Sequence, residues 1–164
     1  MTAQNPDQIT PNFTLSELIH SDVATARHID NTPNAEHQQN LIQSTIQLFQ
    51  PMRELLGQAV KVNSGYRSFS LNRAVNGSQT SAHSVGYAID FVCPKFGTTR
   101  QIVDFLAKEL PKQGILFDQI ILEFPDTPNS WVHIGYKNRQ GRQRGQILTA
   151  KKIKGKTVYL QGIV

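Results

Sequence analysis

The chain has 164 residues, of which 38% are hydrophobic and 18% are charged, and its formal net charge is +5. These values predict one globular domain over residues 1–164, and no stretch approaches the roughly 20 apolar residues that a membrane-spanning helix needs. Cys93 is the only cysteine, which excludes an internal disulfide and a metal site built from several thiolates. We interpret Cys93 as a small core residue at the end of a strand.

The N-terminal part of the chain has the composition of loops and short helices. Residues 1–12 are polar, contain prolines and are expected to be loosely ordered. Thr14 and Glu17 have the spacing of a capping box, which predicts a short helix directly after Thr14.

A longer helix is predicted downstream. Pro33 follows Thr32 in the way that a first-turn proline follows its capping residue. Apolar residues then recur at helical spacing over residues 41–56. Pro51 is expected to kink this helix, and Gly57 is expected to end it.

The rest of the chain is richer in strand-forming residues. A short helix is predicted at 70–76, and a second one, capped by Thr98 or Thr99, continues to Leu110. Helices early and strands later, without regular βαβ alternation, predict an α+β fold in which N-terminal helices pack on a small, mostly antiparallel sheet. The expected strands are 59–64, 87–92, 117–124 and 131–136, followed by a closing hairpin within 145–164 made of 145–150 and 156–163.

The segment from Ser81 to Asp90 is the most informative for chemistry. His83 lies in a predicted loop that turns at Gly86 into the strand at 87–92, and Asp90 lies on that strand. Side chains alternate along a strand, so the small Ala88 shares a face with Asp90 and leaves room beside its carboxylate. The loop and strand therefore offer one nitrogen and one oxygen ligand to a metal ion.

His133 offers a third ligand from the strand at 131–136. Two histidines and one carboxylate leave a fourth position open for water, which is typical of hydrolytic rather than structural zinc. Such an ion lowers the pKa of water and polarises a substrate carbonyl. Taken singly, a strand histidine is more often a hydrogen-bonded structural residue, and Asp90 alone could be a turn or surface group.

The joint spacing of these residues resembles that of a known group of enzymes. Ser-x-His-x-x-Gly-x-Ala-x-Asp over 81–90, with Trp-Val-His at 131–133, is similar to the zinc D-alanyl-D-alanine carboxypeptidase superfamily. That group also contains bacteriophage endolysins and the Hedgehog signalling domain. Ser-Gly-Tyr-Arg-Ser at 64–68 and Leu-Asn at 71–72 match a further segment of the family. The likeness extends from about Phe13 to Tyr136 and is strongest to small single-domain members from phages and bacteria.

The resemblance implies roles for particular residues. His83, Asp90 and His133 would bind one zinc ion. Arg67 would pair with a substrate carboxylate or carbonyl oxygen, since guanidinium binds such groups through paired hydrogen bonds, although without the motif it reads equally well as a surface arginine. Further substrate-binding candidates are Ser81, whose alternative role is capping of the loop, Gln79, and Trp131, whose alternative role is core packing. His20, His28 and His37 are interpreted as ordinary polar residues.

The general base departs from the family pattern. Many members carry Asp or Glu three residues before the last histidine, where this chain has Ser130. If the strands at 117–124 and 131–136 form a hairpin, Glu123 lies opposite or nearly opposite His133 and could serve as the base. Its alternative role is to support a ligand from behind. Asp126 is the second candidate for the base, and Asp118 is interpreted as structural.

The sequence thus predicts a zinc metallopeptidase that hydrolyses a peptide bond in peptidoglycan stem peptides. An L-alanyl-D-glutamate endopeptidase is favoured over a D-alanyl-D-alanine carboxypeptidase. The alternative is a non-catalytic, zinc-stabilised module that binds cell wall or protein. The N-terminal sequence lacks a basic start followed by an apolar run, so we expect no signal peptide. A cytoplasmic product would then reach the cell wall after lysis or by another non-classical route.

Basic residues are concentrated in the segments 137–145 and 151–156. Such a surface could bind nucleic acid or anionic cell wall, or it could simply be solvated. No aromatic interleaving or nucleic-acid motif accompanies it, so we expect no nucleic-acid partner. We also expect no membrane partner, and a monomeric protein.

Overall fold

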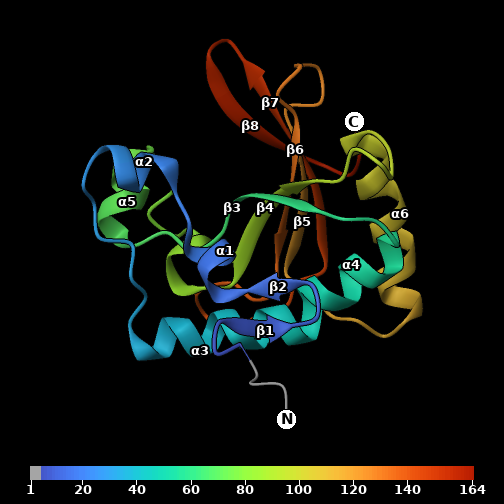
Figure 1. The fold of residues 1–164 in the computed structure, drawn as a ribbon. Helices are drawn as coiled ribbons and strands as arrows, with labels where there is room; N and C mark the ends of the chain where they lie inside the picture. Colours follow the sequence, from blue (N-terminus) through green and yellow to red (C-terminus); the bar gives the residue numbers. More distant parts are fainter. Residues whose placement is uncertain (1–4) are drawn as a thin grey trace.

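A computed structural model describes residues 5–164 of the chain, and its centre is a six-stranded mixed sheet (Figure 1). The strand order is β3-β4-β6-β5-β7-β8, and every pairing is antiparallel except that of β5 with β7. The predicted α+β class is confirmed. The strands are β3 (Lys61–Ser64), β4 (Ala88–Val92), β5 (Gln119–Glu123), β6 (Trp131–Gly135), β7 (Gln146–Ile153) and β8 (Lys156–Gln161).

The N-terminal segment is more regular than the sequence suggests. Residues 1–4 lie outside the described part, but β1 (Gln8–Thr10) pairs with β2 (Phe13–Thr14), so the expectation of loose order over 1–12 is wrong for this strand. Thr14 caps the short helix α1 (Leu15–Ile19) by accepting a hydrogen bond from the backbone of Glu17, as predicted. A second short helix, α2 (Asp22–Ala26), follows.

The long predicted helix runs from α3 (Ala35–Ser44) through a π-helical turn (Thr45–Phe49) into α4 (Gln50–Leu56). Its cap is Asn34, so the predicted start at Thr32 and Pro33 is wrong by two residues. The irregular turn ends two residues before Pro51, which has no N–H to donate to the preceding turn. Gly57 ends the helix in the left-handed conformation, as predicted.

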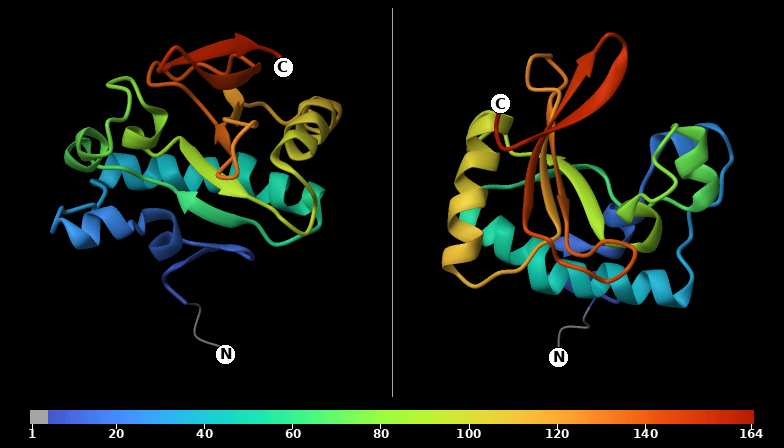
Figure 2. Two further views of the ribbon diagram at one scale, coloured as in Figure 1. Left: turned by 90° about the horizontal axis from the view of Figure 1, so that it is seen from above. Right: turned by 180° about the vertical axis from the view of Figure 1, so that it is seen from behind.

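The remaining helices frame the sheet. The short helix α5 (Phe69–Ala74) and a 3-10 turn (Ala82–Val85) lie between β3 and β4. Helix α6 (Thr99–Lys112) begins at a capping box formed by Thr98 and Gln101. Figures 1 and 2 show α6 against one side of the sheet, with α3 and α4 crossing beneath it. No helix among residues 5–164 combines the length and apolarity that crossing a bilayer requires.

The two faces of the sheet have different roles. Alternation along each strand turns one set of apolar side chains toward α3, α4 and α6, where they form the main core. Cys93 belongs to this core and is fully buried, as predicted. The opposite face carries polar side chains of the central strands, among them Asp90, Glu123 and His133. The core side chains on β4, β5 and β6 are Ile89, Phe91, Ile120, Leu122, Val132 and Ile134, each 0% exposed.

Strands β7 and β8 form the predicted closing hairpin at the edge of the sheet. The hairpin rises beyond the ends of the central strands (Figures 1 and 2). Its first strand runs parallel to β5, with Glu123 opposite Ala150. The pairing with β5 therefore fixes the position of the hairpin next to Glu123.

Candidate metal centre

The first two residues of the centre are positioned by the sheet itself. Asp90 on β4 and His133 on β6 are direct partners in the antiparallel ladder, so their side chains leave the same face. Asp90 Oδ1 lies 3.0 Å from His133 Nδ1. Both side chains are largely buried, at 15% and 12% exposure. Strand pairing alone thus brings together residues that are far apart in the sequence.

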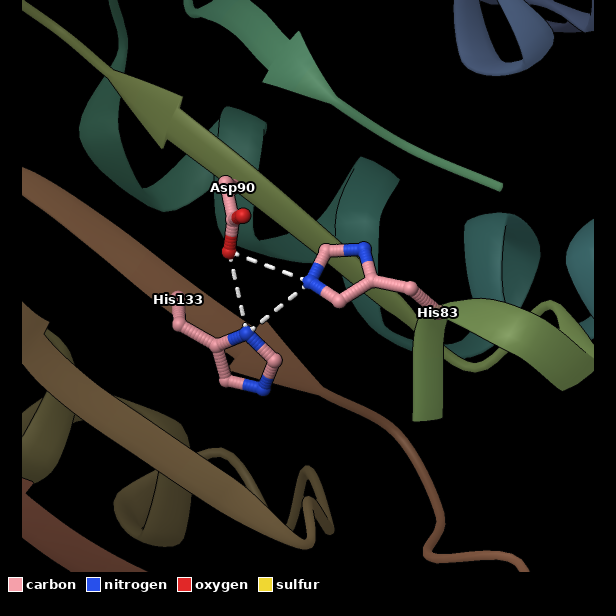
Figure 3. Close-up of side chains that lie close together, drawn as sticks. All are labelled: His83, Asp90 and His133. Carbon is pink, nitrogen blue, oxygen red and sulfur yellow. Dashed lines mark hydrogen bonds and ion pairs between the residues drawn. The ribbon is translucent and has the colours of Figure 1, made fainter. Parts of the chain in front are cut away.

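The third residue, His83, comes from the 3-10 turn that precedes β4. Gly86 ends this turn with a positive φ of 84°, and a Cβ at Gly86 would overlap the backbone carbonyl of His37. The turn directs His83 Nε2 to 3.2 Å from Asp90 Oδ1 and 3.2 Å from His133 Nδ1 (Figure 3). The three side chains named by the sequence motif therefore converge on one point.

The backbone carbonyl of Gly65 fixes the orientation of His83. His83 Nδ1 donates to this oxygen at 2.8 Å, which leaves Nε2 without a proton in the neutral ring. Gly65 is needed because its backbone packs directly on that of Leu18, where a Cβ would overlap the carbonyl oxygen. The sequence alone does not reveal the contact between the Gly65 carbonyl and His83, because a backbone acceptor leaves no mark on residue type.

The chemistry of the cluster fits a divalent cation. Its three potential ligand atoms lie 3.0–3.2 Å apart. Among residues 5–164, His83, Asp90 and His133 are the set of His, Cys, Asp or Glu side chains whose ligand atoms lie close enough together to hold a metal ion. Tetrahedral zinc with bonds of about 2.0–2.1 Å spaces its ligands by roughly 3.3 Å. Without a cation, His133 Nδ1 has at most one proton to share between the lone pairs of His83 Nε2 and Asp90 Oδ1. A cation satisfies all three atoms at once.

The protonation states also suit a metal. Burial lowers the pKa of His83, which outweighs the opposing attraction of Asp90, so the imidazole stays neutral. Burial by itself would raise the pKa of Asp90, but the two neighbouring histidines, His83 and His133, hold it well below its usual value. The set is thus one carboxylate and neutral imidazole, which are the forms that bind zinc.

The ligands lie in a cleft of about 720 Å³ that extends to both sides of them. One side is lined by the loop that follows α5, including Asn76 and Ser81. The other side is lined by Glu123 and by residues of the β7–β8 hairpin. A substrate in this cleft would reach past the metal ligands in both directions.

Glu123, which the sequence placed opposite or nearly opposite His133, lies in this cleft. In the β5–β6 ladder Glu123 pairs with Trp131, and Ile121 is the partner of His133. Glu123 is therefore the diagonal neighbour of His133 on the same face, which remains within reach of a long side chain. Burial raises the pKa of Glu123 to about 7, while the charge of His133 lowers it and that of Asp90 raises it. This value suits a group that takes up and releases a proton near neutral pH.

Arg67 enters the cleft from the segment after β3. Its backbone N–H donates to the carbonyl of His83 at 3.1 Å, which ties this segment to the His83 turn. The half-buried side chain lines the cleft, and within residues 5–164 its buried Nε has no hydrogen-bond partner. Burial lowers the pKa of Arg67, and the charges of Asp90 and Glu123 oppose this shift. Arg67 is thus a cleft residue with a free donor rather than an ordinary surface arginine.

The remaining substrate-binding candidates fall into two groups. Ser81 lines the cleft, and its hydroxyl makes no capping bond to the 3-10 turn, which removes the alternative role. Trp131 also lines the cleft, where it packs on Phe124 with ring centroids 5.3 Å apart and does not join the main core. Gln79 differs from the prediction because it is exposed on the loop and lies outside the cleft lining; its carbonyl accepts from Arg139.

Other acidic and polar candidates have structural partners. Ser130, at the position where many relatives have a carboxylate, donates to the backbone carbonyl of Glu123 at 2.8 Å. Asp126 is exposed, pairs with Lys151 and does not line the cleft, so the second candidate base lies away from the metal ligands. Asp118 is buried and paired twice with Arg144, which agrees with its interpretation as structural.

The three N-terminal histidines lie away from the cluster, as expected. His20 is exposed beside Asp22, and His28 lies in a turn with a positive φ. His37 is buried, and its Nδ1 lies 3.1 Å from the hydroxyl of Tyr66. By contrast, the sequence alone did not reveal the cleft residues of the hairpin, Lys152, Thr157 and Tyr159, because alternation shows which residues share a face but not which face meets the site.

Comparison with known proteins agrees with the geometry. A family model described as Peptidase M15 matches residues 11–134, which include all three candidate ligands, Arg67 and Glu123. No curated protein matches the chain. The matched segment ends before β7, so the hairpin lies outside it.

Proposed function

This chain belongs to the peptidase M15 family, the zinc D-alanyl-D-alanine carboxypeptidase and endolysin superfamily, and we propose that it hydrolyses a peptide bond in peptidoglycan stem peptides. Membership implies a metallopeptidase in a family that depends on zinc. In this proposal one zinc ion is held by His83, Asp90 and His133. The preferred reaction is cleavage between L-alanine and D-glutamate, and removal of a terminal D-alanine is the second candidate.

The observation that carries the proposal is the convergence of His83 Nε2, Asp90 Oδ1 and His133 Nδ1 beside a carboxylate, Glu123, in one open cleft. Structural zinc sites are closed by four protein ligands, whereas catalytic sites keep one position free. The cleft supplies that access. A set of three ligands at the bottom of an accessible cleft supports catalysis over a purely structural role.

The residues of the chain divide the work. A zinc ion bound here supplies a Lewis acid that polarises the scissile carbonyl and makes water a better nucleophile. The Glu123 carboxylate accepts the proton that the attacking water loses and donates it to the departing amine. Arg67 lines the cleft, and its guanidinium hydrogen-bonds a carbonyl or carboxylate oxygen of the substrate, which holds the scissile bond in place.

The shape of the cleft favours an endopeptidase. An enzyme that removes a terminal residue needs to accommodate little beyond that residue, whereas an endopeptidase binds chain on both sides of the scissile bond. The cleft lining runs from Asn76 on one side of the ligands to Tyr159 on the other. This two-sided lining supports cleavage within the stem peptide.

The decisive experiment is product analysis. Zinc-loaded protein is incubated with purified peptidoglycan, and new amino termini and released amino acids are identified by mass spectrometry. A new D-glutamate amino terminus is expected; free D-alanine would instead identify a carboxypeptidase. Arg67→Lys keeps the charge but loses the paired geometry and should lower kcat/KM by about ten- to a hundredfold.

Two controls separate catalysis from binding. Glu123→Gln should retain zinc but release product far more slowly, whereas Asp126→Asn should release product at the wild-type rate because Asp126 lies outside the cleft. If fully zinc-loaded wild-type protein gave no product from any peptidoglycan, the hydrolytic proposal would fail. A zinc-stabilised binding module, which the serine at position 130 suggested, would then be the better description.

A further inference from the structure

The β7–β8 hairpin forms one wall of the metal cleft, although it lies outside the segment that defines the family. Lys152, Thr157 and Tyr159 line the cleft together with Leu148 at the base of the hairpin. Lys152 and Thr157 are direct partners in the β7–β8 ladder, so their side chains share one face. A substrate bound at the metal would therefore meet this face of the hairpin.

Register places Tyr159 in line with Glu123. Glu123 pairs with Ala150 across β5 and β7, and Ala150 pairs with Tyr159 across β7 and β8. Ala150 is fully buried and small, so only its methyl group separates the two longer side chains along this row. Tyr159 is 55% exposed, which leaves its ring free to contact a ligand.

Lys152 is the free positive charge of this wall. Its ammonium donates to Thr157 Oγ1 at 2.8 Å and lies 5.7 Å from the ring centroid of Phe124, and within residues 5–164 it has no carboxylate partner. Its neighbours differ in this respect. Lys151 pairs with Asp126 on the other face, and Arg144 is committed to Asp118. A carboxylate entering the cleft would therefore find Lys152 available.

We propose that Lys152 and Tyr159 form a substrate subsite on the Glu123 side of the metal, where Lys152 binds a free carboxylate of the stem peptide and Tyr159 hydrogen-bonds its backbone. The substrate class rests on the proposed function, whereas the subsite rests on the hairpin geometry. A lysine ammonium in a partly enclosed cleft forms a charge-assisted hydrogen bond with a carboxylate, and stem peptides carry several such groups. Both residues act by positioning the substrate and not in the chemical step.

The hairpin offers a matched control for this proposal. Lys156 is an exposed lysine on the same hairpin, opposite Ile153 in the ladder, and does not line the cleft. Lys152→Gln and Lys156→Gln therefore remove the same charge from the same hairpin on different faces. Tyr159→Phe keeps the ring and removes only the hydroxyl.

The test measures binding without turnover. Zinc-loaded protein carrying Glu123→Gln is titrated calorimetrically with a soluble stem tetrapeptide and with the same peptide after amidation of every carboxylate. Amidation should weaken binding to the parent protein and to the Lys156→Gln form equally. In the Lys152→Gln form, the factor by which amidation lowers the binding affinity should be roughly three- to tenfold smaller. A difference of this size is expected for the interaction energy of one partly exposed charge pair. Tyr159→Phe should weaken both peptides alike.

Each result bears on the subsite separately from catalysis. Equal losses on amidation in the Lys152→Gln and Lys156→Gln forms, or no binding of either peptide, would overturn the subsite. Hydrolysis by the protein with Glu123 intact is measured in parallel, and there Lys152→Gln should raise KM by a similar factor with kcat unchanged. Hydrolysis without coupling at Lys152 would leave the peptidase proposal standing alone. Coupling without hydrolysis would leave the subsite standing alone.

Discussion

Asp90 and His133 face each other directly across β4 and β6, with 3.0 Å between the carboxylate oxygen and the imidazole nitrogen. The pair is built into the register of the sheet, so it does not depend on a mobile loop. His83 approaches from the preceding turn and completes the set. This arrangement makes metal binding and the integrity of the sheet interdependent, and it leads to measurable predictions.

Removal of a ligand should abolish both metal binding and hydrolysis. Asp90→Asn preserves the shape of the side chain but removes the charge that attracts a cation into a buried site. The purified variant should contain far less than one equivalent of zinc by elemental analysis, and its peptidoglycan hydrolysis should fall to background. His20→Ala serves as the control, since His20 is exposed and pairs with Asp22 and not with the candidate ligands. Normal zinc content in Asp90→Asn would contradict the assignment.

Loss of the Glu123 carboxylate should affect the reaction and not the metal. If Glu123 transfers the proton, Glu123→Gln should lower kcat by about a hundred- to ten-thousandfold while zinc content stays at one equivalent. If Glu123 only supported the ligands from behind, zinc affinity would fall as well, by about ten- to a hundredfold. Quenched time-course assays that measure kcat for product release, together with titration of zinc affinity against a chelating dye, distinguish the two roles.

The same substitution should change how the stability of the metal-free protein depends on pH. Burial raises the pKa of Glu123 to about 7 in the folded protein. At pH values between the unfolded pKa and this folded pKa, the folded state binds the proton more tightly than the unfolded state does. Proton binding by Glu123 therefore contributes fully to the free energy of unfolding at low pH, and this contribution is lost as pH rises through about 7. Between about pH 4.5 and 8 the wild type should lose up to about 3 kcal/mol of unfolding free energy more than Glu123→Gln. Urea denaturation with chelator present measures both curves, and parallel curves would contradict burial of this carboxyl.

Gly65→Ala should damage both the fold and the metal site. The new Cβ would overlap the backbone carbonyl of Leu18, and relieving that overlap moves the Gly65 carbonyl that orients His83. We expect a loss of about 1–3 kcal/mol in unfolding free energy, as for other overpacked positions, and weaker zinc binding. Gly114→Ala is the comparison. Gly114 has a positive φ of 68°, but a Cβ there would meet no other atom, so the substitution should cost only about 1 kcal/mol. Equal effects of the two changes on zinc affinity would exclude the proposed coupling.

Arg144→Ala should destabilise the protein through the carboxylate that it leaves behind. Asp118 is 2% exposed and accepts two hydrogen bonds of 2.7 Å from Arg144. An unpaired buried charge of this kind costs about 3–5 kcal/mol. The double change Asp118→Asn with Arg144→Ala should recover part of this loss in thermal denaturation. An additive outcome would show that the two side chains do not stabilise each other.

The sequence by itself determined the local features of this protein. Capping residues and hydrophobic spacing located most helices, and alternation located the strands to within a few residues. The spacing of His83, Asp90 and His133 identified the metal ligands as a set, because a glycine turn and a strand place the first two together through local geometry alone. The helix start at Asn34 and the order of the N-terminal strand were misjudged, since local propensities compete closely at such positions.

Tertiary structure alone decided the composition of the rest of the cleft. Alternation puts Glu123 on the same face as its strand neighbours, but it cannot say that Glu123 pairs with Trp131 instead of His133, because register depends on contacts between distant segments. Likewise, nothing in residues 146–161 signals that β7 lies parallel to β5, which brings Lys152 and Tyr159 to the cleft. The ligands could be found from local sequence because one short segment carries two of them. The substrate wall could not, because long-range strand pairing alone brings it there.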